Sequence, residues 1–398
     1  MKLYLQFGHG MMAHSRELLA RWQGDSGLIL SPRDLKANQL SNLSKDALAT
    51  GAEVLVDPQC YVREADHHRL TDHDYWTAIQ THTTSGFLSG GGAGELLDAV
   101  EAMNADLGTT RRIIPGLLGG NVDEDWFAFQ SQLITDASGR LSRPYLATIA
   151  IGSESMLDEA KIEAIVERAE TWDVDGYYLV AETPGPYLVK DANWLANLLI
   201  LSSGLKLLGR PVIVGYSNHQ GLALAAANVD VIASGTWLNV RAFGPDKFFE
   251  KDEDDISRRA KWFYCPAALS EYKLQYLDAA HRVGCLDRVR PNPPLSDHYC
   301  APLFAGAQPS SVEWGETLGF RHYLDNLWLQ ADQATKSSFD DALDEQDRIL
   351  DGAETLLGVL RSQRIRGGDR DFHGYLDTNR SALAMLNAAR GAQLRRTW

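Results

Sequence analysis

Short apolar runs alternate along the first two thirds of the chain with longer segments of helical periodicity. Each run is rich in Val, Ile, Leu or Tyr and ends at a Gly, a Pro or a polar residue, which is typical of a strand followed by a turn. The eight runs that we predict as strands are residues 3–10, 27–34, 53–60, 111–120, 144–153, 175–185, 210–218 and 230–237.

Eight strands, each followed by a helical segment, predict an α/β fold of the (β/α)₈ or TIM-barrel type. The apolar runs do not alternate strictly with polar positions, as expected of parallel strands that are buried on both faces. A doubly wound open sheet is the alternative with the same order of elements.

The pattern changes after about Gly244. A charged connection at 248–263 precedes a predicted helix at 270–287 and a Pro-rich turn, and the rest is helical and amphipathic. We therefore divide the chain into a barrel (1–245), a connecting segment (246–310) and a helical C-terminal region (311–398).

Composition narrows the class of protein. The chain has 398 residues, 44% hydrophobic and 23% charged, which is ordinary for a globular protein. No apolar run approaches the roughly 20 residues that span a bilayer, and the N-terminus has the pattern of a first strand rather than of a signal peptide. Four scattered cysteines without a CxxC pair favour a reducing cytoplasm. We expect a cytoplasmic protein without a membrane segment.

The charge is unevenly distributed. The formal net charge is −15, which counts against a free-standing nucleic-acid binder. Residues 361–398 nevertheless carry eight Arg against three acids. This basic tail is either a solvated helical face or a surface that holds nucleic acid or a protein partner.

The predicted strand ends supply the candidate site, because barrel chemistry lies at the C-terminal ends of the strands. Asp57 ends an apolar strand, and Asp before Pro also starts ordinary turns, so both interpretations stay open. We predict Asp57 and Glu182 as catalytic carboxylates. The predicted substrate-binding positions at other strand ends are His9, Arg33, Gly119, Gly120, Ser153, His219 and Ser234.

Other chemistries can be compared with the same residues. A zinc amidohydrolase needs several strand-end histidines, and here only His9 and His219 are predicted at strand ends. A radical-generating iron–sulfur cluster needs closely spaced cysteines, and the four cysteines of this chain are widely spread. A retaining glycosidase needs two carboxylates about 5 Å apart, which Asp57 and Glu182 could supply. In the loop after the third strand a group of side chains resembles a metal cluster: Asp66, His67, His68, Asp72 and His73.

Several stretches, taken in order, resemble the tRNA-guanine transglycosylase family and its DNA-modifying relatives. VLVDPQCY matches the place where that family has a strand ending in Asp before an FQ turn. Residues 82–108 resemble the family's substrate loop and the helix after it, and residues 261–284 resemble the region where the family binds zinc. Three further stretches are similar to barrel strands of the family: YLATIAIGS, DVDGYYLVAETPGP and the final strands at 210–243.

The resemblance implies a role for some residues. Asp57 would be the acid/base beside the reacting sugar, and Glu182 would lie near the base. Where the family has its nucleophilic Asp on the last strand, this chain has Ala233, and Asp230 stands at the other end of that strand. The Asp of the base-reading strand is missing from IIPGLLGG. Cys265, His281 and Cys285 form an incomplete zinc set, so we expect no cofactor.

Three hypotheses about function follow. The first is an enzyme that exchanges or removes a base by acting on the N-glycosyl bond of tRNA or DNA. The second is a barrel hydrolase of a sugar or nucleoside. The third is a non-catalytic barrel subunit of a larger complex, with the helical C-terminal region docking a partner.

Overall fold

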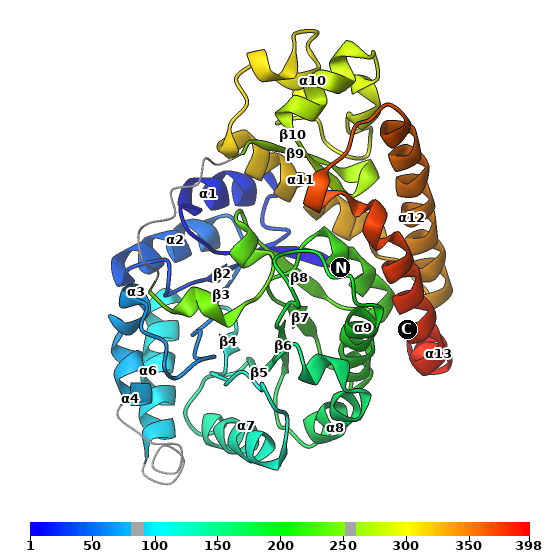
Figure 1. The fold of residues 1–398 in the computed structure, drawn as a ribbon. Coiled ribbons are helices and arrows are strands. Elements are labelled where there is room, and N and C mark those ends of the chain that lie inside the picture. Colours follow the sequence, from blue (N-terminus) through cyan, green and yellow to red (C-terminus); the bar gives the residue numbers. More distant parts are fainter. Residues whose placement is uncertain (81–90, 251–259) are drawn as a thin grey trace.

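A computed structural model describes residues 1–80, 91–250 and 260–398. The stretch 82–108, which resembles a substrate loop and helix, and the charged connection at 248–263 lie partly outside these described residues. The described chain forms a barrel with a small helical and hairpin layer above it and long helices along one side (Figure 1).

The barrel sheet has eight parallel strands in the order β3-β2-β1-β8-β7-β6-β5-β4. Pairing of β1 with both β2 and β8 distinguishes this arrangement from a doubly wound open sheet and confirms the predicted fold. The strands are β1 (Lys2–Gln6), β2 (Gly27–Leu30), β3 (Glu53–Val56), β4 (Arg112–Ile113), β5 (Tyr145–Ile151), β6 (Gly176–Ala181), β7 (Val212–Val214) and β8 (Val231–Ser234).

The two edges of the sheet, β3 and β4, come together just before β4 begins. The backbone N–H of Thr110 donates to the Val54 carbonyl at 2.8 Å, and the Val54 N–H donates to Thr110 Oγ1 at 3.2 Å. These two hydrogen bonds, one between backbone groups and one to a side chain, take the place of a regular ladder between β3 and β4. The barrel is thus nearly closed. The fourth strand is far shorter than the predicted run 111–120, because Pro115 interrupts the pairing with β5, which resumes only as an isolated bridge between Gly119 and Ile151.

Helices follow the strands as predicted. Side-chain oxygens of Asp123, Asp158 and Asp191 accept backbone N–H groups where three of these helices start, which fixes their first turns. The helices and helical turns of the barrel are α1 (Met12–Arg21), α2 (Ala37–Ala49), α3 (His68–Thr71), α4 (Asp74–Gln80), α6 (Gly92–Leu107), α7 (Glu124–Ala137), η1 (Ser155–Leu157), α8 (Glu159–Glu170), α9 (Ala192–Leu207), η2 (His219–Ala227), η3 (Leu238–Val240) and η4 (Pro245–Phe248).

The connecting segment differs from the prediction of one helix at 270–287. Ser270–Lys273 is a strand, β10, that pairs antiparallel with β9 (Trp262–Cys265), and only then does helix α10 (Leu274–Arg282) begin. The sequence SEYK is too short for its pattern to distinguish a strand from a helical turn, and its first three residues are all buried. Short 3₁₀ turns complete the segment: η5 (Pro266–Ala268), η6 (Leu286–Val289), η7 (Ala301–Phe304) and η8 (Pro309–Ser311).

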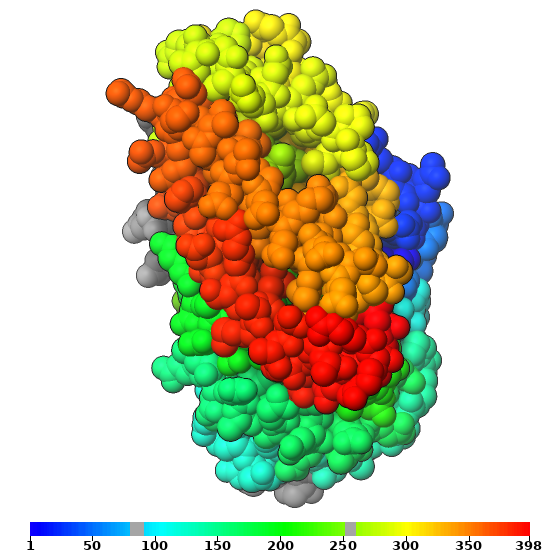
Figure 2. Space-filling model, turned by 90° about the vertical axis from the view of Figure 1, so that its right-hand side faces the viewer, coloured from blue at the N-terminus to red at the C-terminus, as the bar shows by residue number. Residues whose placement is uncertain are grey.

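The C-terminal region is helical as predicted. It contains α11 (Glu316–Ala334), α12 (Phe339–Ser362), η9 (Gly368–Arg370), η10 (Phe372–Tyr375) and α13 (Leu376–Thr397). Helices α12 and α13 lie along the side of the barrel (Figure 2), and α13 packs on α9. This explains why α9 is apolar nearly all round: one face meets the barrel and the other meets α13.

The basic tail is held by acids of the same chain. Five of its eight arginines pair with carboxylates, from the tail itself, from α12, from the barrel or from β10. Arg390, for example, reaches Glu163 on α8 at 2.5 Å. These pairs dock α12 and α13, so the excess of arginine has a structural use. Among the described helices, none is both long enough and apolar enough to cross a membrane.

Candidate functional site

Asp57 follows β3 directly and is 1% exposed. Its Oδ1 accepts the backbone N–H of Gln59 at 2.9 Å, which is the turn-capping role, and Gln59 takes a left-handed conformation there (φ 57°). Three tyrosine hydroxyls also donate to the carboxylate: Tyr61 at 2.9 Å to each oxygen, Tyr178 at 3.2 Å and Tyr216 at 2.8 Å. Asp57 therefore caps a turn and also anchors a network that joins β3, β6 and β7.

Lys247 on η4 is the cation of this network. It is 5% exposed, its Nζ lies 3.3 Å from the centroid of the Tyr216 ring, and it donates to the Asn239 carbonyl at 3.2 Å. Burial raises the pKa of Asp57 against the lowering effect of its hydrogen bonds and of Lys247, and burial lowers the pKa of Lys247 well below its usual value.

Aromatic rings cover Asp57. The Phe243 ring lies 5.0 Å from that of Tyr61 and 5.2 Å from that of Tyr216, centroid to centroid, and Phe248 lies 5.6 Å from Tyr61. Each of these four side chains is at most 4% exposed. A substrate would reach the carboxylate only if these rings moved.

Arg33 belongs to the shell around the same network. Its backbone N–H donates to Gln59 Oε1 at 3.0 Å, and Gln59 Nε2 donates to the Tyr216 hydroxyl at 3.2 Å. Its guanidinium donates to the Lys247 carbonyl at 2.5 Å and pairs with Asp34 at 3.0 Å. Arg33 thus holds η4 in place over the barrel mouth.

Four other predicted positions form a second group at the ends of β4, β5 and β6. Glu182 Oε2 accepts the backbone N–H of Ser153 at 2.9 Å. The Gly119 carbonyl accepts the N–H of Gly152 at 2.9 Å, and Gly120 lies so close that a Cβ on Gly152 would meet its Cα at 2.9 Å. The structure brings Gly119, Gly120, Ser153 and Glu182 together, in a network separate from that of Asp57.

The remaining predicted positions lie near β8. His9 is exposed, and its carbonyl accepts Trp237 Nε1 at 3.0 Å. His219 is buried among aromatic rings, and this burial lowers its pKa to about 4, so it is neutral at pH 7. Ser234 is fully buried at the end of β8.

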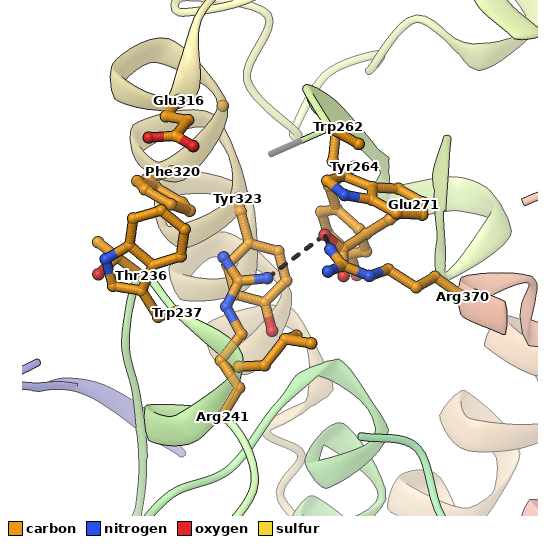
Figure 3. A pocket seen from close by; sticks show the side chains of 13 residues that line it. Thr236, Trp237, Arg241, Trp262, Tyr264, Glu271, Glu316, Phe320, Tyr323 and Arg370 are labelled. Atoms are coloured by element: carbon orange, nitrogen blue, oxygen red, sulfur yellow. Dashed lines mark hydrogen bonds and ion pairs between the residues drawn. The ribbon is translucent and has the colours of Figure 1, made fainter. Parts of the chain in front are cut away.

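An accessible cavity of about 170 Å³ lies beyond the end of β8, between the barrel, the β9-β10 hairpin and α11 (Figure 3). We call it the β8 pocket. Its side chains are mainly aromatic and charged, and they come from distant parts of the chain: Thr236, Trp237, Leu238, Arg241, Trp262, Tyr264, Glu271, Glu316, Phe320, Tyr323 and Arg370.

Glu271 on β10 is the centre of the charged part. Its Oε2 meets Arg241 at 3.4 Å and Arg370 at 2.8 Å, and Arg241 and Glu271 are each 3% exposed. Burial pushes the pKa of Glu271 up, but the two guanidinium groups outweigh it and hold that pKa below its usual value. The Arg241 guanidinium stacks on Tyr323 at 3.4 Å, and that of Arg370 stacks on Trp262 at 3.9 Å.

Three residues that line the β8 pocket have a buried polar atom without a hydrogen-bond partner among the described residues. These atoms are Glu271 Oε1, Thr236 Oγ1 and the Tyr323 hydroxyl. Burying an unmatched acceptor costs about 1–3 kcal/mol, so such atoms mark places where a ligand or water completes the structure. On the other side, Trp237 and Phe320 meet edge to face at 4.7 Å and form an apolar wall.

Thr236 and Trp237 end the predicted run 230–237 and follow β8, but nothing in the sequence pattern pointed to the charged part of the β8 pocket. Arg241, Glu271 and Arg370 are far apart in sequence, and Glu271 stands in the segment that we predicted as a helix. Only the hairpin β9-β10 and the turn η9 bring them together.

The incomplete zinc set after the barrel does not gather. Cys265 and Cys285 are buried thiols, whereas His281 is directed to the Gly306 carbonyl at 3.3 Å. Within the described ranges, the group of three or more ligand-type side chains that do converge is His67, His68 and Glu250.

Comparison with known proteins does not assign the chain to a family. No protein-family model matches the chain, and no curated protein matches it.

Proposed function

We propose that this protein is a transglycosylase-like barrel that binds a purine base, as a nucleoside or as an unpaired base of a nucleic acid, in the β8 pocket, and that it does not use Asp57 as a catalyst. The observation that carries the proposal is the contrast in access. The strand-end carboxylate is sealed and fully hydrogen-bonded, while the β8 pocket is open with unmatched polar atoms.

The walls of the β8 pocket fit a flat ring. Base–aromatic stacking contributes about 1–3 kcal/mol per base, and here the ring faces are supplied by Trp237, Trp262 and Phe320. The cavity of about 170 Å³ is below the roughly 300–1,000 Å³ of pockets for drug-sized ligands. It therefore suits a single base, with the sugar directed outward.

The polar groups fit the edge of guanine better than that of other bases. An arginine donates well to guanine O6 and N7, and a carboxylate oxygen accepts from N–H groups on a base edge. Arg241 and Arg370 are such donors, and Glu271 Oε1 is an acceptor without a partner among the described residues. Glu271 is ionised at pH 7 because the guanidinium groups lower its pKa.

Tryptophan fluorescence tests this proposal, because Trp237 and Trp262 line the β8 pocket. Titration with guanosine should change the emission with saturation, and adenosine and cytidine should bind more weakly. Trp237→Ala should weaken guanosine binding at least tenfold. Trp328→Phe, at a position of α11 that does not line the β8 pocket and where Trp328 stacks on Trp22, is the control and should bind as the wild type does. Equal binding by Trp237→Ala, or no saturable signal with any nucleoside, would reject the proposal.

A second candidate is the N-glycosyl enzyme, which exchanges or removes a base in tRNA or DNA with Asp57 and Glu182 as carboxylates. The observation that favours it is the raised pKa of Asp57 at a strand end, since perturbed carboxyls concentrate at active sites. In this reaction a carboxylate stabilises or attacks the sugar C1′ as the base leaves. A barrel hydrolase of sugars or nucleosides would use the same pair.

Mass spectrometry separates the two candidates. Wild-type protein and Asp57→Asn are incubated with tRNA and with DNA, with and without free guanine, and released or exchanged bases are measured. Our main proposal predicts no release by either protein, although both bind guanosine. Release by the wild type that is lost in Asp57→Asn would establish the second candidate in its place.

A further inference from the structure

A cluster of metal-ligating side chains lies beside the Asp57 network and has no part in the base-binding proposal. His67 ends the loop after β3, His68 begins α3, and Glu250 follows η4, some 180 residues later in the chain. One ligand atom from each lies within 4.8 Å of the other two. The two imidazole rings stack at 5.1 Å with an angle of 13° between their planes, so they present their edges side by side.

Backbone contacts fix these three residues relative to one another. The His67 N–H donates to the Phe248 carbonyl at 3.1 Å, and the His68 N–H donates to Glu250 Oε1 at 2.6 Å. The Glu250 N–H donates to Asp66 Oδ1 at 2.8 Å. Such supporting hydrogen bonds orient the ligands of known metal sites, and here they already orient the three side chains.

The hydrogen bonding of the cluster's side chains is also incomplete, and a bound ion would complete it. His67 Nδ1 is buried and has no hydrogen-bond partner among the described residues. His68 Nδ1 and Glu250 Oε1 approach to 2.5 Å, where one atom must carry a proton that a cation could replace. The neighbouring His73 is different, because its ring is already bonded to the carbonyls of Pro32 and Leu35 at 3.0 and 3.1 Å.

We propose that His67, His68 and Glu250 bind a zinc ion. Two imidazoles and one carboxylate form a ligand set typical of Zn²⁺, with water in the fourth position, whereas Mg²⁺ and Ca²⁺ prefer oxygen ligands alone. Zn–N bonds of about 2.0–2.1 Å in a tetrahedron separate ligand atoms by about 3.3 Å. The present spacing, from 2.5 Å to at most 4.8 Å, reaches this by side-chain rotation of exposed groups.

The ion would link η4, which lies over the barrel mouth, to the segment after β3. Glu250 is two residues beyond η4, whose Lys247 and Phe248 pack on the tyrosines that hold Asp57. The two histidines end the loop that begins at Asp57 and start α3. Zinc would join the two segments at a point where hydrogen bonds alone join them now. We therefore expect zinc to stabilise η4 on the loop after β3.

Zinc binding by the full-length, untagged protein tests the proposal. After stripping with chelator and dialysis against limiting ZnCl₂, zinc content is measured by plasma mass spectrometry and affinity by titration calorimetry. The wild type should hold one equivalent. His68→Ala and Glu250→Gln should each weaken binding at least tenfold, and both positions are exposed, so the variants should fold. His281→Ala, which removes a half-buried histidine elsewhere in the chain, is the control.

A second readout is thermal unfolding, since an ion that binds only the folded state raises Tm. Zinc should raise the Tm of the wild type and of His281→Ala, and it should raise that of His68→Ala much less. The four cysteines are buried and should not compete in the folded protein. Absence of stoichiometric zinc in the wild type, or equal affinity in His68→Ala and Glu250→Gln, would overturn the proposal.

Discussion

The Asp57 network and the β8 pocket both place a buried carboxylate at the C-terminal end of the barrel, yet they differ in how that carboxylate is satisfied. Asp57 receives hydrogen bonds from three tyrosines and a backbone N–H, and it lies under aromatic rings. Glu271 is matched on one oxygen by two arginines and unmatched on the other, at the wall of a cavity. Our proposal therefore rests on an incomplete set of hydrogen-bond partners beside a cavity, and not on burial of a polar group alone.

The comparison predicts that Asp57 is first of all a structural residue. Asp57→Ala would leave the buried tyrosine hydroxyls without their acceptor. Leaving a buried donor unsatisfied costs about 1–3 kcal/mol, so we expect a loss of at least this order in the free energy of unfolding. Urea unfolding followed by circular dichroism measures it. A loss under about 1 kcal/mol would show that the network is not holding β3, β6 and β7 together.

The pH dependence of stability should have opposite signs for the two carboxylates. The folded-state pKa of Asp57 is raised, so its contribution is greatest below the unfolded pKa of about 3.9 and is lost as pH rises through the folded pKa. The folded-state pKa of Glu271 is lowered, so its contribution is present above about 4.3 and is lost as pH falls through the folded pKa.

Urea unfolding at a series of pH values, with Asp57→Asn and Glu271→Gln as references, measures these slopes. The stability of the wild type relative to Asp57→Asn should decrease with rising pH above about 4, and relative to Glu271→Gln it should decrease with falling pH below about 4. The same sign for both references would contradict the different environments described above.

The smallest effect is expected at Glu182. Its Oε2 accepts a single backbone N–H, from Ser153, and the side chain is half-buried. Glu182→Gln keeps an oxygen that can accept this bond, so the free energy of unfolding should change by less than about 1 kcal/mol. Guanosine binding should not change at all. A tenfold weakening of guanosine binding would contradict this expectation and would show that the ligand site extends to the end of β6.

The barrel was predictable because each of its elements is local. The apolar runs, the turn residues and the capping aspartates act within a few residues, and the helical segments followed the strands as expected. The length of β4 was overestimated, because Pro115 interrupts its pairing with β5 inside an apolar run. The strand β10 was missed because its four residues carry no periodic signal, and its partner strand decides its conformation.

The site was predictable only in part, for a related reason. The strand-end rule placed Asp57, Glu182 and Ser153 at the correct end of the barrel, and it led to Thr236 and Trp237 at the β8 pocket. It could not say that the chain would cover Asp57 with Phe243 and Phe248, since these follow the last strand. Nor could it join Arg370 to Glu271, which are 99 residues apart and meet only through the packing of the C-terminal region on β10.

Calorimetric titration of guanosine into Asp57→Asn and Glu271→Gln tests the central claim most directly, with both variants first shown to be folded. If the β8 pocket holds the ligand, Asp57→Asn binds as the wild type does, and Glu271→Gln binds at least tenfold more weakly. If instead Asp57→Asn loses binding and Glu271→Gln keeps it, the ligand enters the barrel mouth, and the carboxylate described here as sealed is the functional one.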